Sequence, residues 1–187
     1  RIPPVRYERE YPGALVHLDV KELPPMGDAA KEYQFTAVDD HSREVYSAIF
    51  PRQSTKVACD FLNRVLAFFN YPVERVMTDN SLIFTMKHAC FSHRKTRFEI
   101  LLKTKCIKLL LIRPHHPETN GKVERFHRTV EEEVFRLQSF LTPQQRHRAL
   151  ASWLYHYNHS RPHLGIGGLT PSQRRSLFFA QRCHQVA

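Results

Sequence analysis

Three carboxylates stand where packing alone would not place a charged side chain. Asp19 interrupts an apolar run, Asp79 ends a second run, and Glu124 flanks an apolar stripe of helical spacing. Singly, an acid in such a place is more often a helix cap or an ion-pair partner. Jointly, acids from three elements meet either against their mutual repulsion or around a divalent cation, and carboxylate oxygens are ligands that Mg²⁺ or Mn²⁺ prefers. The sequence therefore predicts a divalent metal site.

The elements that must position these acids follow from hydrophobic period. Residues 14–21 alternate, which predicts a strand with His17, Asp19 and Lys21 on one face. Further strands are expected over residues 33–38, 44–50, 73–78 and 106–112. Helices are expected from Ser54 or Thr55, over residues 82–102, after residue 120 and from Thr142. An antiparallel meander followed by alternating helices and strands indicates an α/β domain.

The composition narrows the class of protein. The 187 residues suit one domain, and 42% hydrophobic residues argue against disorder. Lys and Arg number 28 against 18 Asp and Glu, and the net charge of +10 indicates a polyanionic partner. No apolar run approaches the ~18 residues of a membrane span and no signal peptide is evident, so we expect a soluble, intracellular protein. The four scattered cysteines indicate neither a zinc knuckle nor a disulfide framework.

Three short motifs carry the predicted acids. They read His17-Leu-Asp19-Val, Thr78-Asp79-Asn80 and Asn120-Gly-Lys-Val-Glu124-Arg125-Phe. They resemble the signatures of the retroviral-type integrase catalytic core of the DDE superfamily, in the version found in bacterial insertion-sequence transposases. Residues 38–43, 113–121 and 157–163 add to the resemblance, which is collinear over about residues 7–175.

The resemblance implies a ribonuclease H-like fold: a mixed five-stranded sheet whose first three strands are antiparallel, flanked by helices, with a helical C-terminal extension. The element order inferred from hydrophobic period agrees with this fold independently. We expect residues 1–12 to form an extended arm or linker remnant, residues 13–140 the catalytic core, and residues 141–187 the helical extension and a basic tail. No helix-turn-helix pattern precedes Tyr7, so the region that recognises transposon ends is expected outside this chain.

The resemblance also implies DDE chemistry, in which Asp19 bridges two Mg²⁺ or Mn²⁺ ions, Asp79 completes one site and Glu124 the other. Two such ions flank a scissile phosphate and assist an in-line displacement without a covalent protein intermediate. Water nicks the end of a transposon, and the freed 3′-hydroxyl joins that end to target DNA. The implied enzyme is a polynucleotidyl transferase that forms a homodimer or a higher assembly on DNA, in the bacterial cytoplasm at the nucleoid.

The predicted helix that carries Glu124 offers further polar residues. Asn120, Glu124 and Arg128 follow at i, i+4 and i+8 and share one face. We predict that four residues of this helix contact DNA, namely Asn120, Lys122, Arg125 and Arg128. The alternative is that the cations solvate the helix or pair with the three glutamates further along it. Residues 86–113, with eight basic residues and one acid (8 − 1 = +7), are a second candidate path for a phosphate backbone.

Other polar residues near the motifs are expected to be structural. Asp39 and Asp40 follow a predicted strand, where turn chemistry explains them. His17 lies two residues before Asp19 on the same strand face and is expected to be a satisfied core histidine.

Two departures from the family pattern bear on activity. Ser81 stands where the family usually has Gly, which tolerates unusual dihedral angles more easily. Between Asp79 and Glu124 lie 44 residues, roughly nine more than is typical, and we place the insertion in a surface loop near residues 93–103. These departures keep open the alternative of a catalytically inactive DNA-binding remnant. A related nuclease that only hydrolyses DNA shares every catalytic residue and also stays open.

Overall fold

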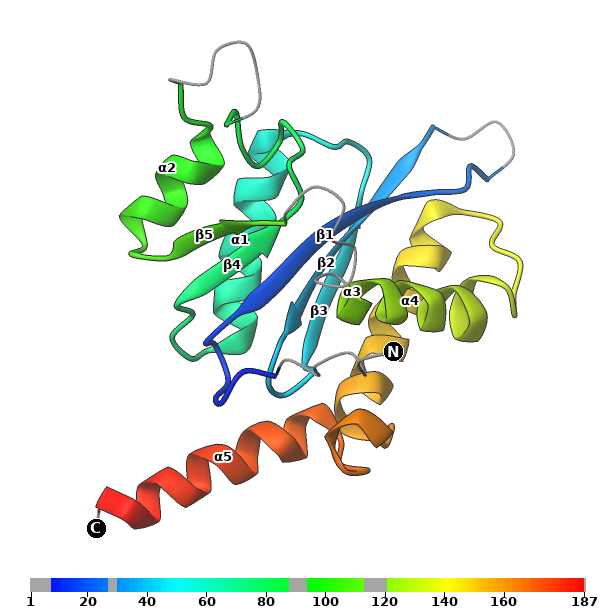
Figure 1. The fold of residues 1–187 in the computed structure, drawn as a ribbon. Coiled ribbons are helices and arrows are strands. Elements are labelled where there is room, and N and C mark those ends of the chain that lie inside the picture. The colour runs from blue at the N-terminus through cyan, green and yellow to red at the C-terminus, as the bar shows by residue number, and fades with distance from the viewer. Residues whose placement is uncertain (1–7, 27–29, 88–93, 113–120, 187) are drawn as a thin grey trace, which may run out of the picture.

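The computed structural model describes residues 8–26, 30–87, 94–112 and 121–186 (Figure 1). One five-stranded sheet has the strand order β3-β2-β1-β4-β5. Its strands are β1 (Val16–Leu23), β2 (Glu32–Asp39), β3 (Val45–Phe50), β4 (Arg75–Thr78) and β5 (Lys108–Leu111). Strands β1, β2 and β3 pair antiparallel, whereas β4 runs parallel to β1 and β5 parallel to β4. The predicted mixed sheet with an antiparallel first part is confirmed.

Helices cover both faces of the sheet (Figure 1). Their bounds are α1 (Thr55–Phe69), α2 (Arg97–Thr104), α3 (Gly121–Val130), α4 (Pro143–His159) and α5 (Pro171–Val186), with a π-helical turn η2 (Glu131–Phe135) after α3 and a 3₁₀ turn η3 (Leu164–Ile166) after α4. Helices α1 and α2 share one buried core with the sheet, and α3 and α4 share a second core on the opposite face. The result is a three-layer α/β/α sandwich.

Local signals start the helices where the sequence predicts. The Ser54 side chain accepts a hydrogen bond from the backbone N–H of Val57 at 3.3 Å and caps α1. Thr142 caps α4 in the same way, and Pro143 occupies its first turn, where a missing N–H costs nothing.

The long helix predicted over residues 82–102 is wrong, because only Arg97–Thr104 is helical within the described part of that range. Turns precede it, and they bury Phe84 against Phe98 with ring centroids 5.0 Å apart. A capping box then starts α2: Thr96 accepts from the Glu99 backbone N–H, and the Glu99 carboxylate accepts from the Thr96 backbone N–H. The helix begins where this reciprocal cap satisfies its first amides.

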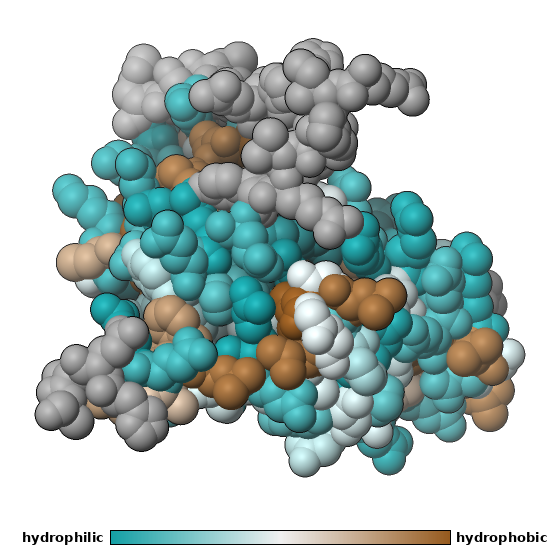
Figure 2. Space-filling model, turned by 60° about the horizontal axis from the view of Figure 1, so that its bottom comes forward, coloured by the Kyte–Doolittle hydropathy of each residue, from teal (hydrophilic) through white to brown (hydrophobic). Residues whose placement is uncertain are grey.

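The expected basic tail is a helix, α5, which extends from one end of the molecule (Figure 1). Thr170 and Gln173 cap each other reciprocally at its start. Its first half is anchored through an ion pair between Arg175 Nη1 and Glu44 Oε1 at 2.6 Å and through Phe178, whose ring lies 5.5 Å from that of His41. Figure 2 turns this end toward the viewer and shows a largely hydrophilic surface interrupted by apolar patches.

Helix α4 belongs to the same packed body as α3. Leu150, Leu154 and Tyr157 of α4 are buried in the second core together with Val123 and Phe126 of α3. The helical extension predicted from residue 141 is therefore present and packed, and the boundary at residue 140 stays a prediction.

Tyr157 gives this core a predicted pH dependence. Burial raises the pKa of its phenol to about 12, above the ~10 of an exposed tyrosine, so the folded state holds the proton more tightly than the unfolded state. The free energy of unfolding should therefore fall by about 2–3 kcal/mol as the pH rises from ~10 through ~12. Urea unfolding of the parent and of Tyr157→Phe across that range measures it. In Tyr157→Phe, the decrease in the free energy of unfolding over this pH range should be smaller by about 2–3 kcal/mol. Parallel plots of unfolding free energy against pH for the two proteins would contradict the prediction.

The described cysteines and helices agree with what the composition indicates about the class of protein. Cys59, Cys106 and Cys183 are free thiols, and Cys90 lies outside the described residues. Across the described ranges, no helix combines the length and apolarity that crossing a bilayer requires.

Candidate active site

Asp19 lies on β1, and Asp79 directly follows the neighbouring parallel strand β4. The ladder between β1 and β4 pairs Val16 with Val76 and His17 with Met77. Continuing this register by two residues brings Asp19 beside Asp79, the first residue after β4. Adjacent strands lie about 4.8 Å apart. The register of the sheet therefore points to neighbouring backbone positions for these two acids.

Helix α3 runs alongside β1 in the same direction. The Nδ1 atom of His127 lies 3.5 Å from Asp19 Oδ2, and Lys21 Nζ lies 3.0 Å from Glu131 Oε2. Two residues of a strand cover about 6.6 Å and four residues of a helix about 6 Å, so the two contacts repeat in step along both elements. The polar face of β1 thus meets one continuous face of α3 and η2.

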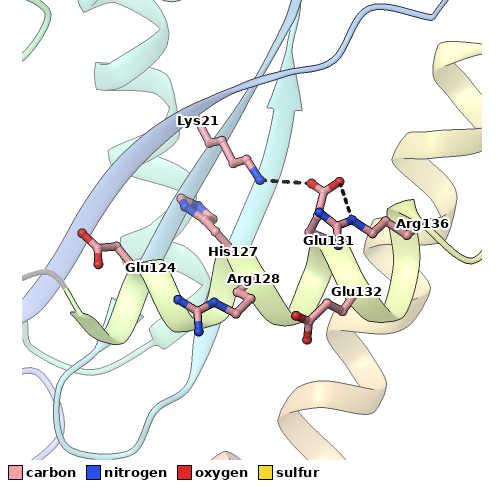
Figure 3. A pocket seen from close by; sticks show the side chains of 7 residues that line it. All are labelled: Lys21, Glu124, His127, Arg128, Glu131, Glu132 and Arg136. Carbon is pink, nitrogen blue, oxygen red and sulfur yellow. Dashed lines mark hydrogen bonds and ion pairs between the residues drawn. The ribbon is translucent and has the colours of Figure 1, made fainter.

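Glu124 lies on that same helix face, one turn before His127. Figure 3 shows Glu124, His127 and Glu131 on the side of the helix that meets Lys21. The carboxylate is exposed and borders an open depression of about 330 Å³. The depression is lined by Lys21, Glu124, His127, Arg128, Glu131, Glu132 and Arg136. Glu124 is therefore accessible beside the strand that carries Asp19.

The three acids sit on adjoining elements without forming a ligand cluster. Within the described ranges, no three His, Cys, Asp or Glu side chains are grouped so that they could hold a metal ion. Asp79 Oδ1 instead accepts the backbone N–H of Ser81 at 3.1 Å. The donor set still suits a hard divalent cation, because it consists of carboxylates from a strand, a strand end and a facing helix.

His127 is the site residue that the sequence interpretation missed. It is buried, and burial together with the charge of Lys21 lowers the pKa of its imidazole to about 4. Its Nε2 atom shares a hydrogen bond with Thr36 Oγ1 at 3.0 Å, which holds the ring against β2. A signal was available, since His127 follows Glu124 by three residues on the same helix face.

The predicted DNA contacts divide into three cases. Asn120 lies outside the described residues, whereas Arg125 and Arg128 are exposed on α3. Lys122 is half-buried, and its Nζ lies 2.5 Å from Asp40 Oδ1. Glu131 pairs with Lys21 and Arg136, and Glu133 pairs with Arg161. The exposed Arg125 and Arg128 can still solvate the helix, so both DNA contact and this alternative stay predictions.

Asp39, Asp40 and His17 are buried, and their structural role stays a prediction. His17 is bonded through Nε2, whereas its buried Nδ1 has no partner among the described residues, so it is not the fully satisfied core histidine that was expected. Asp39 is fully buried and accepts hydrogen bonds from the backbone N–H of Gly13 and from the backbone N–H and hydroxyl of Ser42. Asp40 Oδ1 lies 2.7 Å from His17 Nε2. Hydrogen bonds from His17 and Lys122 hold the pKa of the Asp40 carboxyl below its usual range against the opposing effect of burial. Burial lowers the pKa of Lys122.

The departures at Ser81 and in the spacing leave the frame of the site in place. Ser81 does not adopt a positive φ, so no left-handed backbone demands Gly there. Strand β5 stays in register with β4, pairing Leu111 with Thr78. The long interval before Glu124 therefore does not displace the last strand of the sheet.

Sequence comparison decides the family. The pattern of the integrase core domain matches residues 9–117, which is more than half of the chain, and a second integrase core domain pattern matches residues 105–171. The chain belongs to the integrase core domain family. A Spiroplasma virus protein named as a candidate integrase is 26% identical over 175 residues, 89% of this chain and 48% of that protein. An uncharacterized 39.2 kDa protein of insertion element IS476 from Xanthomonas euvesicatoria is 29% identical over 152 residues, 81% of this chain and 41% of that protein.

This integrase core domain therefore spans about half the length, or less, of these two relatives. Among solved structures, a chain of the simian T-cell lymphotropic virus intasome has a TM-score of 0.72 at 19% identity, over 90% of this chain and 56% of that one. The HTLV-2 integrase catalytic core in complex with magnesium has a TM-score of 0.68 at 17% identity, over 89% of this chain and 98% of that one. The BIV integrase catalytic core has a TM-score of 0.66 at 22% identity, over 94% of this chain and 99% of that one. The predicted ribonuclease H-like fold is confirmed.

Proposed function

We propose that this integrase core domain is the catalytic domain of a DDE transposase or integrase, a metal-dependent polynucleotidyl transferase acting on DNA. The observation that carries the proposal is the parallel ladder of β1 and β4, whose register, continued by two residues, pairs Asp19 with Asp79. Helix α3, which carries Glu124, contacts Asp19 through His127 and so supports the third position. The magnesium in the HTLV-2 integrase core supports the choice of metal. The insertion-element relative supports a transposon as the source of the DNA.

Each acid has a role in this proposal. Asp19, Asp79 and Glu124 would hold Mg²⁺ or Mn²⁺. Such ions, when bound, activate the attacking oxygen and stabilise the leaving oxygen of an in-line displacement. Half-buried Asp19 and exposed Asp79 and Glu124 leave the site open to a scissile phosphate. Water would first attack the phosphorus at the end of the element and displace the 3′-oxygen, which leaves as a 3′-hydroxyl. That hydroxyl would then attack a phosphorus of the target strand at the same site and displace the target's 3′-oxygen.

DNA reaches the site over cationic surfaces. Arg125 and Arg128 are exposed on the helix that carries Glu124. A second cationic surface surrounds α2, where Lys103, Lys105 and Lys108 are exposed. The net charge of +10 supports a polyanion as partner. The dimeric form of the HTLV-2 core and the simian virus intasome support a homodimer or higher assembly on DNA. The relative from a Xanthomonas insertion element supports the bacterial cytoplasm as the location.

Replacing both exposed arginines of α3 tests the DNA path. In Arg125→Gln/Arg128→Gln, two phosphate contacts are lost, so the slope of log K against log salt for duplex DNA should flatten by about 1.8. Fluorescence anisotropy over a salt series measures the slope. Arg148→Gln, which removes an exposed arginine from α4, is the control and should keep the parent slope. A slope unchanged in the double variant would place the DNA elsewhere.

A strand-transfer assay tests the function itself. The full-length protein that contains this chain is incubated with Mg²⁺ or Mn²⁺, labelled terminal repeats of its own element and target plasmid, and nicked and joined products are separated. Metal-dependent nicking followed by joining is expected. Nicking without joining would replace the proposal by a hydrolytic nuclease, and salt-sensitive binding without either product would indicate an inactive DNA-binding remnant.

A further inference from the structure

A buried charge cluster joins the first turn of α3 to the sheet. Asp40 follows β2 and is 1% exposed. Its Oδ1 atom lies 2.7 Å from His17 Nε2 of β1 and 2.5 Å from Lys122 Nζ of α3. Lys122 Nζ also donates to the Asp40 backbone carbonyl at 3.2 Å, and Asp40 Oδ2 accepts the Arg9 backbone N–H at 2.8 Å. One carboxylate therefore ties together three separate parts of the chain.

Two members of this cluster each lie two residues before one of the proposed metal-binding acids. His17 precedes Asp19 by two residues on the same face of β1, and Lys122 precedes Glu124 by two residues on α3. A shift of Asp40 relative to either partner would therefore change the separation between Asp19 and Glu124.

The cluster differs from the ion pair between Lys21 of β1 and Glu131 of η2 in its exposure to water. The side chains of Lys21 and Glu131 are 34% and 22% exposed, so water and salt screen their pair. Asp40 is shielded from water, and removing one partner would leave its charge uncompensated in the interior. The geometry around Asp40 is thus the more rigid of the two contacts.

We propose that Asp40, Lys122 and His17 form a positioning cluster that sets the approach of Glu124 to Asp19, and that Lys122 acts through Asp40 and not through DNA. This inference rests on the proposed function of the three acids. A misplacement of about 1 Å at a reacting centre costs on the order of 100-fold in rate. Loss of the cluster therefore lowers the rate of the chemical step and leaves DNA affinity unchanged.

The kinetic test uses Lys122→Met, Asp40→Asn and the double variant in the 187-residue chain. Each single variant should lower kcat for metal-dependent nicking on the order of 100-fold, with KM for DNA and the salt slope of binding within about twofold of the parent. The double variant should lose no more than the worse single variant, because the two residues act as one unit. Lys31→Met, which breaks an exposed pair with Glu22, is the control and should keep parent kinetics.

The opposite pattern would overturn the inference. If Lys122→Met weakens DNA binding and flattens its salt slope while Asp40→Asn nicks at the parent rate, Lys122 is a phosphate contact. If a single variant does not fold because it buries an unpaired charge, the double variant, which buries none, takes its place in the comparison.

Amide hydrogen exchange without metal or DNA separates this inference from the proposed function. Amides of residues 121–130 should exchange about tenfold faster in Lys122→Met and in Asp40→Asn than in the parent, with α1 unchanged. Parent-like exchange in α3 would contradict the positioning role. If the parent itself does not nick DNA, the proposed function fails, and the exchange data still decide whether Asp40 fixes α3.

Discussion

Asp19→Asn is expected to abolish nicking of DNA with Mg²⁺ or Mn²⁺ while salt-sensitive DNA binding persists. The amide keeps the size of the side chain but removes the negative charge with which Asp19 would hold a divalent cation. Metal ions supply several kcal/mol of transition-state stabilisation, and each ~1.4 kcal/mol is tenfold in rate, so the expected loss is on the order of 10³-fold or more. Single-turnover nicking of a labelled terminal repeat measures the loss, and anisotropy measures binding.

The fold of the variant should be intact, because the Asp19 side chain is 20% exposed and lies beside His127 without being sealed in the core. Its thermal unfolding is therefore expected to match that of the parent. Asp60→Asn is the matched control: Asp60 is exposed on α1 and forms an ion pair with Arg64 of the same helix. The control should nick within about twofold of the parent rate. Equal nicking by Asp19→Asn and the parent would rule out the DDE assignment.

The elements around the site are predictable because their signals are local. Ser54 and Thr142 cap helices with their own side chains, within three residues of the amides they satisfy. Alternation along β1 puts His17, Asp19 and Lys21 on one face, and all three meet polar partners there. Such patterns involve only neighbours in the chain, so they can be read without tertiary contacts.

An ion pair between residues far apart in the sequence leaves no local pattern that predicts it. Asp40 and Lys122 are 82 residues apart. Turn chemistry accounts for Asp40, and an exposed-looking helix position suggests DNA for Lys122, so local interpretation treats the two charges separately. Only the order of strands in the sheet brings α3 over β1 and β2 and places the ammonium on the carboxylate.

Competing local signals explain the two errors in the helices. Thr170-Pro171 repeats the signature that starts α4, yet the glycines just before it and the absence of acids after it favour a turn-rich basic tail. Between residues 82 and 102, apolar residues suggest a continuous helix. In the structure Phe84 is buried from a turn, and Thr96 caps the start of the short helix α2.

Phe126→Ala is expected to destabilise the fold by about 3–5 kcal/mol, because it removes a fully buried ring and leaves a cavity that the core cannot close. Phe126 is 1% exposed and lies edge-on to Tyr157 with centroids 5.2 Å apart, and 5.9 Å from the ring of Trp153. Urea unfolding at neutral pH measures the loss. Tyr155→Ala removes an aromatic ring from the exposed side of α4, where the side chain is 68% exposed, and should cost ~1 kcal/mol or less.

The site depends on this core because Phe126 stands between Glu124 and His127 on α3. The apolar face of the helix buries Val123, Phe126 and Val130, and the polar face carries Glu124 and His127 toward β1. A helix of ten residues is not stable in isolation, so packing against α4 must hold it in place. Nicking by Phe126→Ala should therefore fail at a lower temperature than nicking by the parent, in step with unfolding. A destabilisation below about 1 kcal/mol would mean that the second core does not hold α3, and that the ionic contacts along β1 do so instead.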